Sequence, residues 1–577
     1  MTFVSLSEEI KVFFGTNIKY NMEVHMILNG SEILANVLIE QGVDTVFGYP
    51  GGAVLNIYDA LYKYSDKIHH YMTAHEQGAA HAADGYARST GKTGVVIATS
   101  GPGATNLVTG IATAYMDSIP MVAITGNVST NLIGCDSFQE VFITGITMPI
   151  TKHNFVVRKV DELADILREA FRIAQSDRPG PVLVDIPKDI TAAKATYIPM
   201  EKKVEPRSDK IVGNIDEIAD LINRAERPFI YFGGGVKISE ASNELRELIM
   251  KADIPSAYTL MAAGVLGYGE RNNLGLMGMH GNYSANCAAN RADVMLAIGT
   301  RFSDRVASNT SKFGHNAKIV HIDIDSAEIN KNITADYSII GDVKTVLTKL
   351  LPKIKKADHS AWIEKIAIWK NDDYIPEDSD TELKPHFVIE TACKEAGEDA
   401  VFVTDVGQHQ MWAAQFLHHV KPRNFLTSGG LGTMGYGYGA AIGAKIANPD
   451  VPVVHFTSDG SFHMNMNELC TAVSYNVPVI TVILNNKVLG MVRQWQSVFY
   501  DRRFASSEPE RVTDYVKVAE GFGATGYHCE TPAEFEEAMK KALKADGPVW
   551  IECVIDREEK VLPMIPAGGT VHDTIFK

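Results

Sequence analysis

The residues best suited to chemistry are a carboxylate and a side-chain amide that follow two apolar runs near the C-terminus. The run VPVVHF leads into an acidic turn containing Asp459, Gly460 and Ser461, and the run VPVITVIL leads to Asn486. We expect both runs to be parallel strands of one β–α–β unit, which places their carboxyl ends side by side. Carboxylate and amide oxygens suit Mg²⁺, and the small turn residues allow backbone N–H groups to approach phosphates. The pattern predicts a metal-bridged diphosphate anchor, although an ordinary acidic turn is the alternative.

A second carboxylate, Glu76, begins a predicted helix of small residues, QGAAHAADGYARS. Acidic residues are favoured at helix N-termini because of the helix dipole, so Glu76 could be a simple capping residue. Two glycine-rich turns, at residues 48–52 and 99–106, are predicted to converge around it. A carboxylate in such a pocket has a raised proton affinity. We therefore expect Glu76 to hydrogen-bond a ring nitrogen of a cofactor.

The turn at residues 99–106 and a third glycine-rich turn each have competing interpretations. The turn TSGPGATN lacks the third glycine of a dinucleotide-binding fingerprint, which makes that reading weak. The turn GTMGYGYGAAIGA, at residues 432–444, contains Met434 among glycines. Met434 is either a core side chain or a wedge beneath a bound ring.

The composition places limits on the class of protein. A chain of 577 residues is too long for one core, and its 45% hydrophobic and 21% charged residues are typical of globular proteins. The net charge of −16 argues against a nucleic-acid surface. The six cysteines form no CxxC pair, which favours reduced, mostly buried thiols and a cytoplasmic location. The sequence contains no apolar stretch of about 18 residues, the length that a membrane span needs, so we expect no span. We also expect no signal peptide at the start of the chain.

Apolar runs alternate with helical patterns along the chain, which predicts an α/β protein of three doubly wound parallel-sheet domains. Residues 1–26 are expected to be an extension, and the predicted domains cover residues 27–190, 205–355 and 380–577. Polar stretches separate them. The first and third domains share a plan, a glycine-rich turn after an early strand. The predicted strands are TVFGYP, TGVVIATS, MVAITG, PVLVDIP, FIYFGGG, VMLAIGT, KIVHIDID, AVFVTDV, VVHFTSD, VITVIL and VWIECVI.

From about residue 27 to the end, the sequence resembles the catalytic subunits of the acetohydroxyacid synthase (acetolactate synthase) family, which use thiamin diphosphate (ThDP). Two positions depart from the family pattern: Ser458 replaces the first glycine of the diphosphate motif, and Ser129 replaces a proline at the channel entrance. The stretches that carry the resemblance are GYPGGA, HEQGAAH, TSGPGATN, DSFQE, RPGPVLVDIPKD, GMHG, RFSDRV, KIVHIDIDSAEI, GQHQMW, GTMGYG, GMVRQWQ and VLPMIPAGG.

The resemblance implies roles around ThDP. Glu76 would protonate the pyrimidine ring, and Met434 would hold the cofactor bent. Mg²⁺ would be bound by Asp459, Asn486 and the backbone carbonyl of Val488. The other residues that it places at ThDP are Gly51, Gly52, Gln408, His409, Gly432, Gly460 and Ser461.

Five strand-end turns in the middle domain fit a dinucleotide lying across an α/β sheet, although each turn alone is unremarkable turn chemistry. As a set they resemble the FAD site of the biosynthetic synthases, in which the flavin has no net redox role. The catabolic acetolactate-forming enzymes lack this flavin. The residues assigned to FAD are Arg178, Gly233, Gly234, Gly235, Met279, His280, Arg301, Asp323, Asp342 and Val343.

The resemblance also implies a substrate pocket, for which each residue has a simpler explanation. Arg301 could hold a keto-acid carboxylate because it is always cationic, or could make only a salt bridge or an FAD contact. Lys188 could be a solvated loop residue. Trp495 lies in the polar segment RQWQ, a poor setting for a core tryptophan. The predicted pocket residues are Phe138, Gln139, Lys188, Met491 and Trp495.

The implied activity is decarboxylation of pyruvate and ligation of the product to pyruvate or 2-ketobutyrate, in branched-chain amino-acid synthesis. The site would form between the subunits of a homodimer or tetramer, and a small regulatory subunit is left open. Three alternatives remain: a ThDP-dependent keto-acid decarboxylase or other carboligase, a flavin-linked pyruvate oxidase, and a nucleotide-binding regulator without enzymatic activity.

Overall fold

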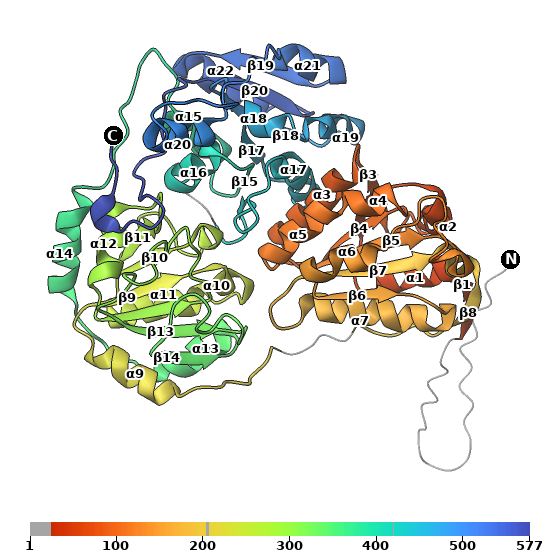
Figure 1. The fold of residues 1–577 in the computed structure, drawn as a ribbon, viewed down its shortest axis with the longest axis horizontal. Coiled ribbons are helices and arrows are strands. Elements are labelled where there is room, and N and C mark those ends of the chain that lie inside the picture. Colours follow the sequence, from red (N-terminus) through yellow and green to blue (C-terminus); the bar gives the residue numbers. More distant parts are fainter. Residues whose placement is uncertain (1–24, 203–206, 419–420) are drawn as a thin grey trace, which may run out of the picture.

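The structure is a computed structural model that describes residues 25–202, 207–418 and 421–577. It contains three α/β units, each built on a six-stranded sheet in which all strand pairs are parallel (Figure 1). The third unit, in blue, contacts both the first unit, in orange, and the middle unit, in green. The first 24 residues of the predicted extension lie outside the described residues. The predicted α/β class with three parallel-sheet domains is confirmed.

The first unit has the strand order β3-β2-β4-β5-β7-β6. Helices α1 (Gly30–Glu40) and α7 (Leu163–Gln175) cover one face, and α3 (Glu76–Thr90) and α5 (Val108–Met116) cover the other. Because both faces are covered, the central strands are continuous apolar runs. The strands are β2 (Thr45–Tyr49), β3 (His69–Met72), β4 (Gly94–Ala98), β5 (Met121–Asn127), β6 (His153–Val156) and β7 (Pro181–Pro187); β1 (Met26–Asn29) and β8 (Lys194–Tyr197) form a separate antiparallel pair.

The middle unit has the order β11-β10-β9-β12-β13-β14. Counted along the unit this is 3-2-1-4-5-6, the order of doubly wound dinucleotide-binding folds. Its strands are β9 (Pro228–Phe232), β10 (Ser256–Tyr258), β11 (Asn273–Leu276), β12 (Val294–Ile298), β13 (Lys318–Asp323) and β14 (Tyr337–Ile340). Its helices are α9 (Ile215–Arg224), α10 (Gly234–Ile238), α11 (Ser242–Ala252), α12 (Tyr283–Arg291), α13 (Val343–Leu350) and α14 (Ser360–Lys370).

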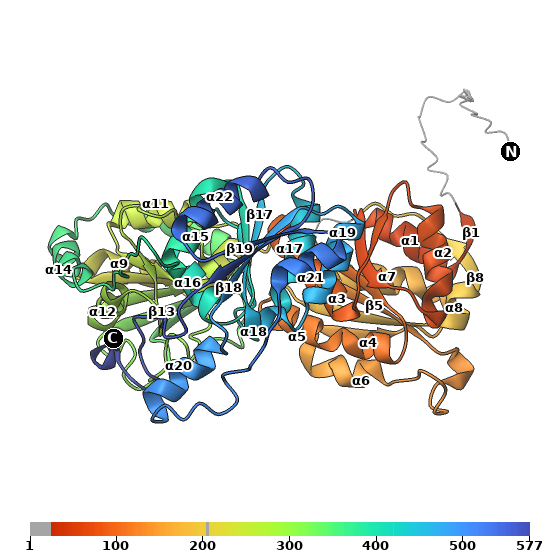
Figure 2. The same ribbon diagram turned by 90° about the horizontal axis from the view of Figure 1, so that it is seen from above.

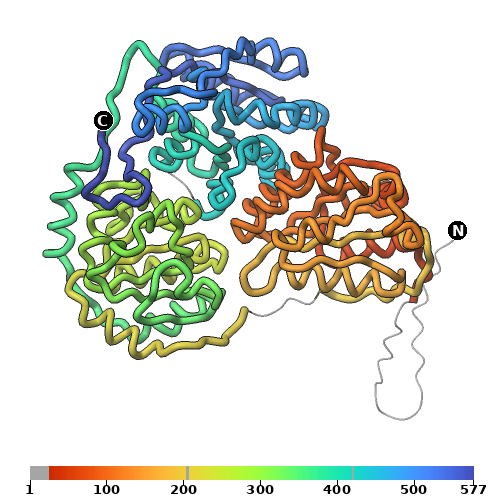
Figure 3. The backbone as a smooth tube through the Cα atoms, viewed as in Figure 1, coloured from red at the N-terminus to blue at the C-terminus, as the bar shows by residue number. Residues whose placement is uncertain are grey.

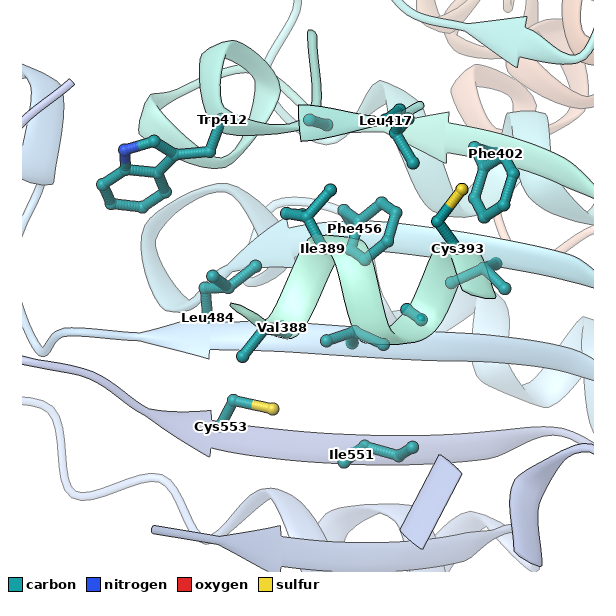
Figure 4. Packing of buried hydrophobic residues seen from close by; sticks show 14 of the residues in the cluster. Val388, Ile389, Cys393, Phe402, Trp412, Leu417, Phe456, Leu484, Ile551 and Cys553 are labelled. Carbon is teal, nitrogen blue, oxygen red and sulfur yellow. The ribbon is translucent and has the colours of Figure 1, made fainter. Parts of the chain in front are cut away.

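The third unit has the order β16-β15-β17-β18-β20-β19, which repeats the topology of the first. The two units, which were expected to share a plan, thus have the same strand order. Figure 4 shows Phe402, Phe456, Leu484 and Ile551 of the sheet packing against α15 (Pro385–Ala396). The strands are β15 (Val401–Thr404), β16 (Phe425–Leu426), β17 (Val453–Ser458), β18 (Val479–Asn485), β19 (Thr525–Cys529) and β20 (Val549–Val554).

The chain passes between the middle and third units twice. After α14 the chain runs along the outside of the molecule into the third unit, and the C-terminal segment returns to the middle unit (Figure 3). There the Ile565 N–H donates to the Met279 carbonyl at 2.8 Å. None of the helices in the described ranges is long and apolar enough to cross a membrane. Four of the six cysteines are buried, as expected.

The first and third units meet through α3 and α17 (Tyr436–Ala447), at the centre of the molecule (Figure 2). A Cβ atom at Gly85 would overlap Ala440, and one at Gly443 would overlap Ala82. The two helix backbones therefore touch, which only glycine allows. Close backbone contact makes this a rigid junction between the two units.

Candidate active site

The predicted diphosphate anchor lies at the carboxyl ends of two neighbouring strands. β17 and β18 pair in parallel, with Ser458 opposite Leu484. Asp459 therefore begins the short helix α18 (Asp459–Phe462) beside Asn486, as the sequence predicted. Ser458 has a φ of −133°, which any residue can adopt, so a serine replaces the usual glycine without backbone strain.

The oxygens of this anchor are buried. Asp459 is 2% exposed, and within the described residues its Oδ1 atom has no hydrogen-bond partner. Burial raises the pKa of Asp459 to about 6. The Asn486 Oδ1 atom accepts from the Val488 N–H at 3.3 Å. In the described ranges no three His, Cys, Asp or Glu side chains cluster as metal ligands, so a cation here would depend on amide, carbonyl and phosphate oxygens.

A small cavity of about 80 Å³ adjoins the anchor. Asn486 Nδ2 donates to Gln408 Oε1 at 3.1 Å, and Gln408 Nε2 donates to Gln494 at 3.0 Å, which fixes the Gln408 side chain. Both ring nitrogens of His409 lack partners among the described residues, and burial lowers its pKa to about 4, so the ring is neutral. The predicted residues that line the cavity are Gln408, His409, Met434, Gly460, Asn486 and Met491.

Asp405 comes directly before Val406, which lines this cavity, and it was not predicted from the sequence. It accepts from the Gly437 N–H and from Thr457 Oγ1, each at 2.6 Å. Burial alone would raise the pKa of Asp405, but hydrogen bonds and the nearby His455 ring lower it to about 2. The sequence did carry a signal for Asp405, because it is a charged residue near the end of the apolar run AVFVTDV. Asp405 thus fixes the start of α17, next to the turn that carries Met434.

Glu76 is the first residue of α3, and its side chain is buried. Its Oε2 atom accepts from Asn106 Nδ2 at 2.9 Å. A Cβ at Gly103 would lie 3.1 Å from Glu76 Oε1, and one at Gly51 would contact Thr99. The two glycine-rich turns therefore converge around Glu76, as predicted.

The other candidates of the first unit lie at its surface. Gly51 and Gly52 follow β2, and Lys188 is the exposed first residue of α8 (Lys188–Ala192). Phe138 is 89% exposed, and Gln139 packs its backbone against Gly101. Together with Glu76, these residues line neither the small cavity nor the large cleft described next. Within one chain, these candidates are therefore separate from the residues that line the two spaces.

A cleft of about 1710 Å³ runs along the carboxyl ends of the middle sheet. Its floor is the point where the strand order reverses, between β9 and β12, where Gly235 and Gly299 touch. Burial raises the pKa of Asp323 at this edge to about 6. The structure brings the whole predicted FAD set to this cleft: Arg178, Gly233, Gly234, Gly235, Met279, His280, Arg301, Asp323, Asp342 and Val343.

Two arginines join the first and middle units at this cleft. Arg178 donates to Asp325 at 3.1 Å and to Glu328 at 2.7 Å. Arg301 donates to the Met116 carbonyl at 2.7 Å. Among the described residues Arg301 forms no salt bridge with an acidic side chain, and its predicted contact with a keto acid stays a prediction.

Helix α20 (Gly490–Phe499) connects the small cavity to the cleft. Met491 lines both spaces, and Trp495 lines the cleft. The guanidinium of Arg305 lies 5.8 Å from the Trp495 ring centroid. In the described part of the chain the Trp495 Nε1 atom has no partner although it is buried. Trp495 thus faces a cavity rather than the core, as its polar setting predicted.

A buried ion network between the first and third units was also missed. Arg88 donates to Asp117 at 2.9 Å and to the Thr427 carbonyl at 2.8 Å. Asp117 accepts from the Gly429 and Gly430 N–H groups. The contacts with Thr427, Gly429 and Gly430 span more than 300 residues, so a single sequence carries no local signal for them.

Comparison with known proteins places this architecture in a class. Models of the thiamine pyrophosphate enzymes match residues 28–146 as the N-terminal TPP binding domain, 215–350 as the central domain and 405–553 as the C-terminal TPP binding domain. The chain is a thiamine pyrophosphate (ThDP) enzyme.

Its relatives narrow the class. The chain is 47% identical over 566 residues to the acetolactate synthase large subunit of Mycobacterium tuberculosis, covering 95% of this chain and 91% of that protein. It is 43% identical over 564 residues to the isozyme 3 large subunit of Escherichia coli, covering 95% and 98%. The large subunit of Cyanidium caldarium is 44% identical over 564 residues, covering 94% and 96%. The chain belongs to the acetolactate synthase large-subunit family.

Proposed function

We propose that this chain decarboxylates pyruvate and joins the remaining two-carbon unit to a second 2-keto acid. Pyruvate as the second substrate gives 2-acetolactate, and 2-ketobutyrate gives 2-aceto-2-hydroxybutyrate, the first common step of branched-chain amino-acid synthesis. Family membership supports the reaction. The observation that carries it is the unpartnered Asp459 oxygen beside Asn486, in a chain that matches TPP-binding domains at both ends.

Bound ThDP supplies an electron sink for loss of CO₂ and for formation of the new carbon–carbon bond. Glu76 would hold a proton at the pyrimidine nitrogen, and Met434 would pack beneath the cofactor. Asp459, Asn486 and the Val488 carbonyl would hold Mg²⁺ at the diphosphate. The residues fit this assignment because Asp459 Oδ1 is buried without a partner among the described residues, and such an oxygen is a suitable ligand for a hard cation.

The active unit in this proposal is a dimer. Within one chain, Glu76 does not line the cavity that adjoins the Asp459 anchor, so the two would act on one cofactor only across a subunit interface. A second copy related by two-fold symmetry would complete both sites at once. Two such dimers could form a tetramer. The relatives are named large subunits, which supports a small regulatory subunit as a further partner.

The middle unit would bind FAD as a structural group. Its 3-2-1-4-5-6 strand order and the cleft at the reversal of that order are typical of dinucleotide sites. Flavin chemistry would instead indicate a pyruvate oxidase, the second candidate. The first unit supplies Lys188, Phe138 and Gln139 near the glycine turns, and α20 supplies Met491 and Trp495, for the keto acids. The non-enzymatic alternative is not supported, because the family consists of enzymes.

Incubation with pyruvate, ThDP and Mg²⁺, with and without FAD, tests the proposal. We expect 2-acetolactate, a flavin spectrum that stays oxidised, and no oxygen consumption. Free acetaldehyde as the main product would indicate a decarboxylase, and oxygen uptake equal to product would indicate an oxidase. Glu76→Gln should reduce turnover about 10²–10⁴-fold, the usual contribution of an acid–base group. Near-normal turnover in that variant would remove Glu76 from the mechanism.

A further inference from the structure

One carboxylate outside the site is fully buried and makes an unusual pair of contacts. Glu468, in the third unit, has no exposed surface. Its Oε1 atom accepts from the His75 N–H at 3.0 Å, and its Oε2 atom accepts from the Ala74 N–H at 3.0 Å. Oε2 also accepts from Thr471 Oγ1 at 2.6 Å. Both carboxylate oxygens are thus used by backbone N–H groups of the first unit.

The contacts fall on the turn that leads into Glu76. His75 is the residue before α3, and its Nδ1 atom accepts from the Gln77 N–H at 3.1 Å. Gly78, on the first turn of α3, faces Glu468 so closely that a Cβ there would overlap the carboxylate. The start of the helix is therefore shaped to receive this side chain. Burial raises the pKa of Glu468, and its hydrogen bonds partly offset that increase.

We infer that Glu468 is a positioning residue that sets where the Glu76 carboxylate lies. This inference rests on the proposed role of Glu76 as the acid–base group at ThDP. Two charge-assisted hydrogen bonds to consecutive backbone N–H groups fix the direction in which α3 begins, and Glu76 is its first residue. A displacement of about 1 Å at a reacting group can cost about 100-fold in rate.

Glu468 is also close in the sequence to Asp459 of the proposed cation site. Asp459 and Glu468 flank one short segment that includes α18 and the 3₁₀ turn Met466–Glu468. In the proposed dimer, this segment serves one active site at its Asp459 end and positions Glu76 for the other site at its Glu468 end.

The test uses Glu468→Gln, which keeps the side-chain shape but turns one acceptor into an N–H₂ group facing a backbone N–H. In the cofactor-free protein we expect faster hydrogen–deuterium exchange at the amides of residues 74–76 and unchanged exchange elsewhere. Turnover with pyruvate should fall about 10–100-fold, while the affinity for ThDP and Mg²⁺ stays at the wild-type value. Tyr475→Phe is the matched control, since Tyr475 accepts only from Met72 N–H at the edge of the same turn.

The decisive comparison is a double-variant cycle. If Glu468 acts through Glu76, Glu468→Gln adds no further loss of turnover in a Glu76→Gln background. The inference would be overturned, and the proposed function left standing, by either of two results. One is that the turnover losses of the two single variants multiply in the double variant. The other is that Glu468→Gln turns over normally while Glu76→Gln is slow. Normal turnover of Glu76→Gln would instead overturn the proposed function. If Glu468→Gln does not fold, Gly78→Ala disturbs the same contact from the α3 side and must show the same non-additivity.

Discussion

Three of the residues proposed for the active site carry buried polar atoms without partners in the described part of the chain. Asp459 Oδ1, both nitrogens of His409 and Trp495 Nε1 are such atoms within the described residues. Leaving a buried donor or acceptor unpaired costs about 1–3 kcal/mol, so a folded protein keeps such groups where a ligand can satisfy them. The three side chains lie around the small cavity or along the cleft, which agrees with the roles proposed for them.

The first prediction concerns the cation ligands. Asp459→Ala and Asn486→Ala should each abolish Mg²⁺-dependent binding of ThDP, because each removes an oxygen from a cation that accepts few protein ligands. Titration of each purified variant with ThDP at saturating Mg²⁺ measures this. Wild-type affinity in both variants would contradict the assignment of the site.

The second prediction concerns the choice of second substrate. Pyruvate and 2-ketobutyrate differ by one methylene, and such a difference is worth about 1–3 kcal/mol in an apolar pocket. Trp495 offers a large rigid surface in the cleft, on the helix that also carries Met491 of the small cavity. Trp495→Leu should lower the ratio of 2-aceto-2-hydroxybutyrate to 2-acetolactate in a competition between both keto acids. An unchanged ratio in a folded, cofactor-loaded variant would make Trp495 a structural residue.

Single residues were predictable where local sequence defines their surroundings. Asp459, Asn486 and Glu76 follow apolar runs or glycine turns, and the structure places them as expected. Asp405, Glu468 and the network of Arg88 with Asp117 were missed. Their partners come from other strands or from another unit, and a single sequence does not show which distant segments meet.

Strands, like single residues, were predicted from the sequence only where local sequence defines their surroundings. Most interior strands were predicted, because a strand covered on both faces is a continuous apolar run. The interior strand β10 was missed because it has only three residues. Strands such as β3 and β19 were missed, since they lie at or near sheet edges and contain polar residues. The strand orders were not predicted either. Strand orders depend on how strands and helices that are distant in the sequence pack together. The order of strands in the middle sheet was therefore known only from the structure.

The third prediction concerns helix α10, which starts at the reversal of the middle sheet. A Cβ at Gly235 would lie 2.7 Å from the Gly299 Cα atom. Gly235→Ala should therefore push α10 from the sheet and weaken FAD binding by about 1–3 kcal/mol, the usual cost of overpacking. Flavin fluorescence titration measures the loss, and the ThDP affinity should not change.

The control for Gly235→Ala is Gly521→Ala, because Gly521 has open space around its Cβ position. That variant should bind FAD as the wild type does. Equal FAD affinity in both variants would show that α10 does not form part of the flavin site.

At the scale of the whole molecule, the two groups that we propose to act on ThDP lie in different units of one chain. Glu76 belongs to the first unit, and the Asp459 anchor belongs to the third. The junction between α3 and α17, the Glu468 contacts and the Arg88 network hold these two units together. These contacts fix the position of Glu76 relative to Asp459 within one chain.

The fourth prediction follows from this separation. Glu76→Gln and Asp459→Ala should each be inactive alone, but subunits exchanged between them should recover about a quarter of wild-type activity, because half the dimers then carry one intact site. The measurement is acetolactate formation after mixing and reassembly of the two variants. No recovery, with mixed dimers demonstrated by differently tagged chains, would place both residues in the same chain's site.

The contact between α3 and α17 also limits how such proteins can recombine. At Gly85 and Gly443 the two backbones touch, so a methyl group on either side would separate the first unit from the third. A hybrid gene that takes its first unit from one relative and its third from another should work only if α3 and α17 are inherited together. Crossover points would then fall outside this helix pair, and the two helices would pass between lineages as one unit of inheritance.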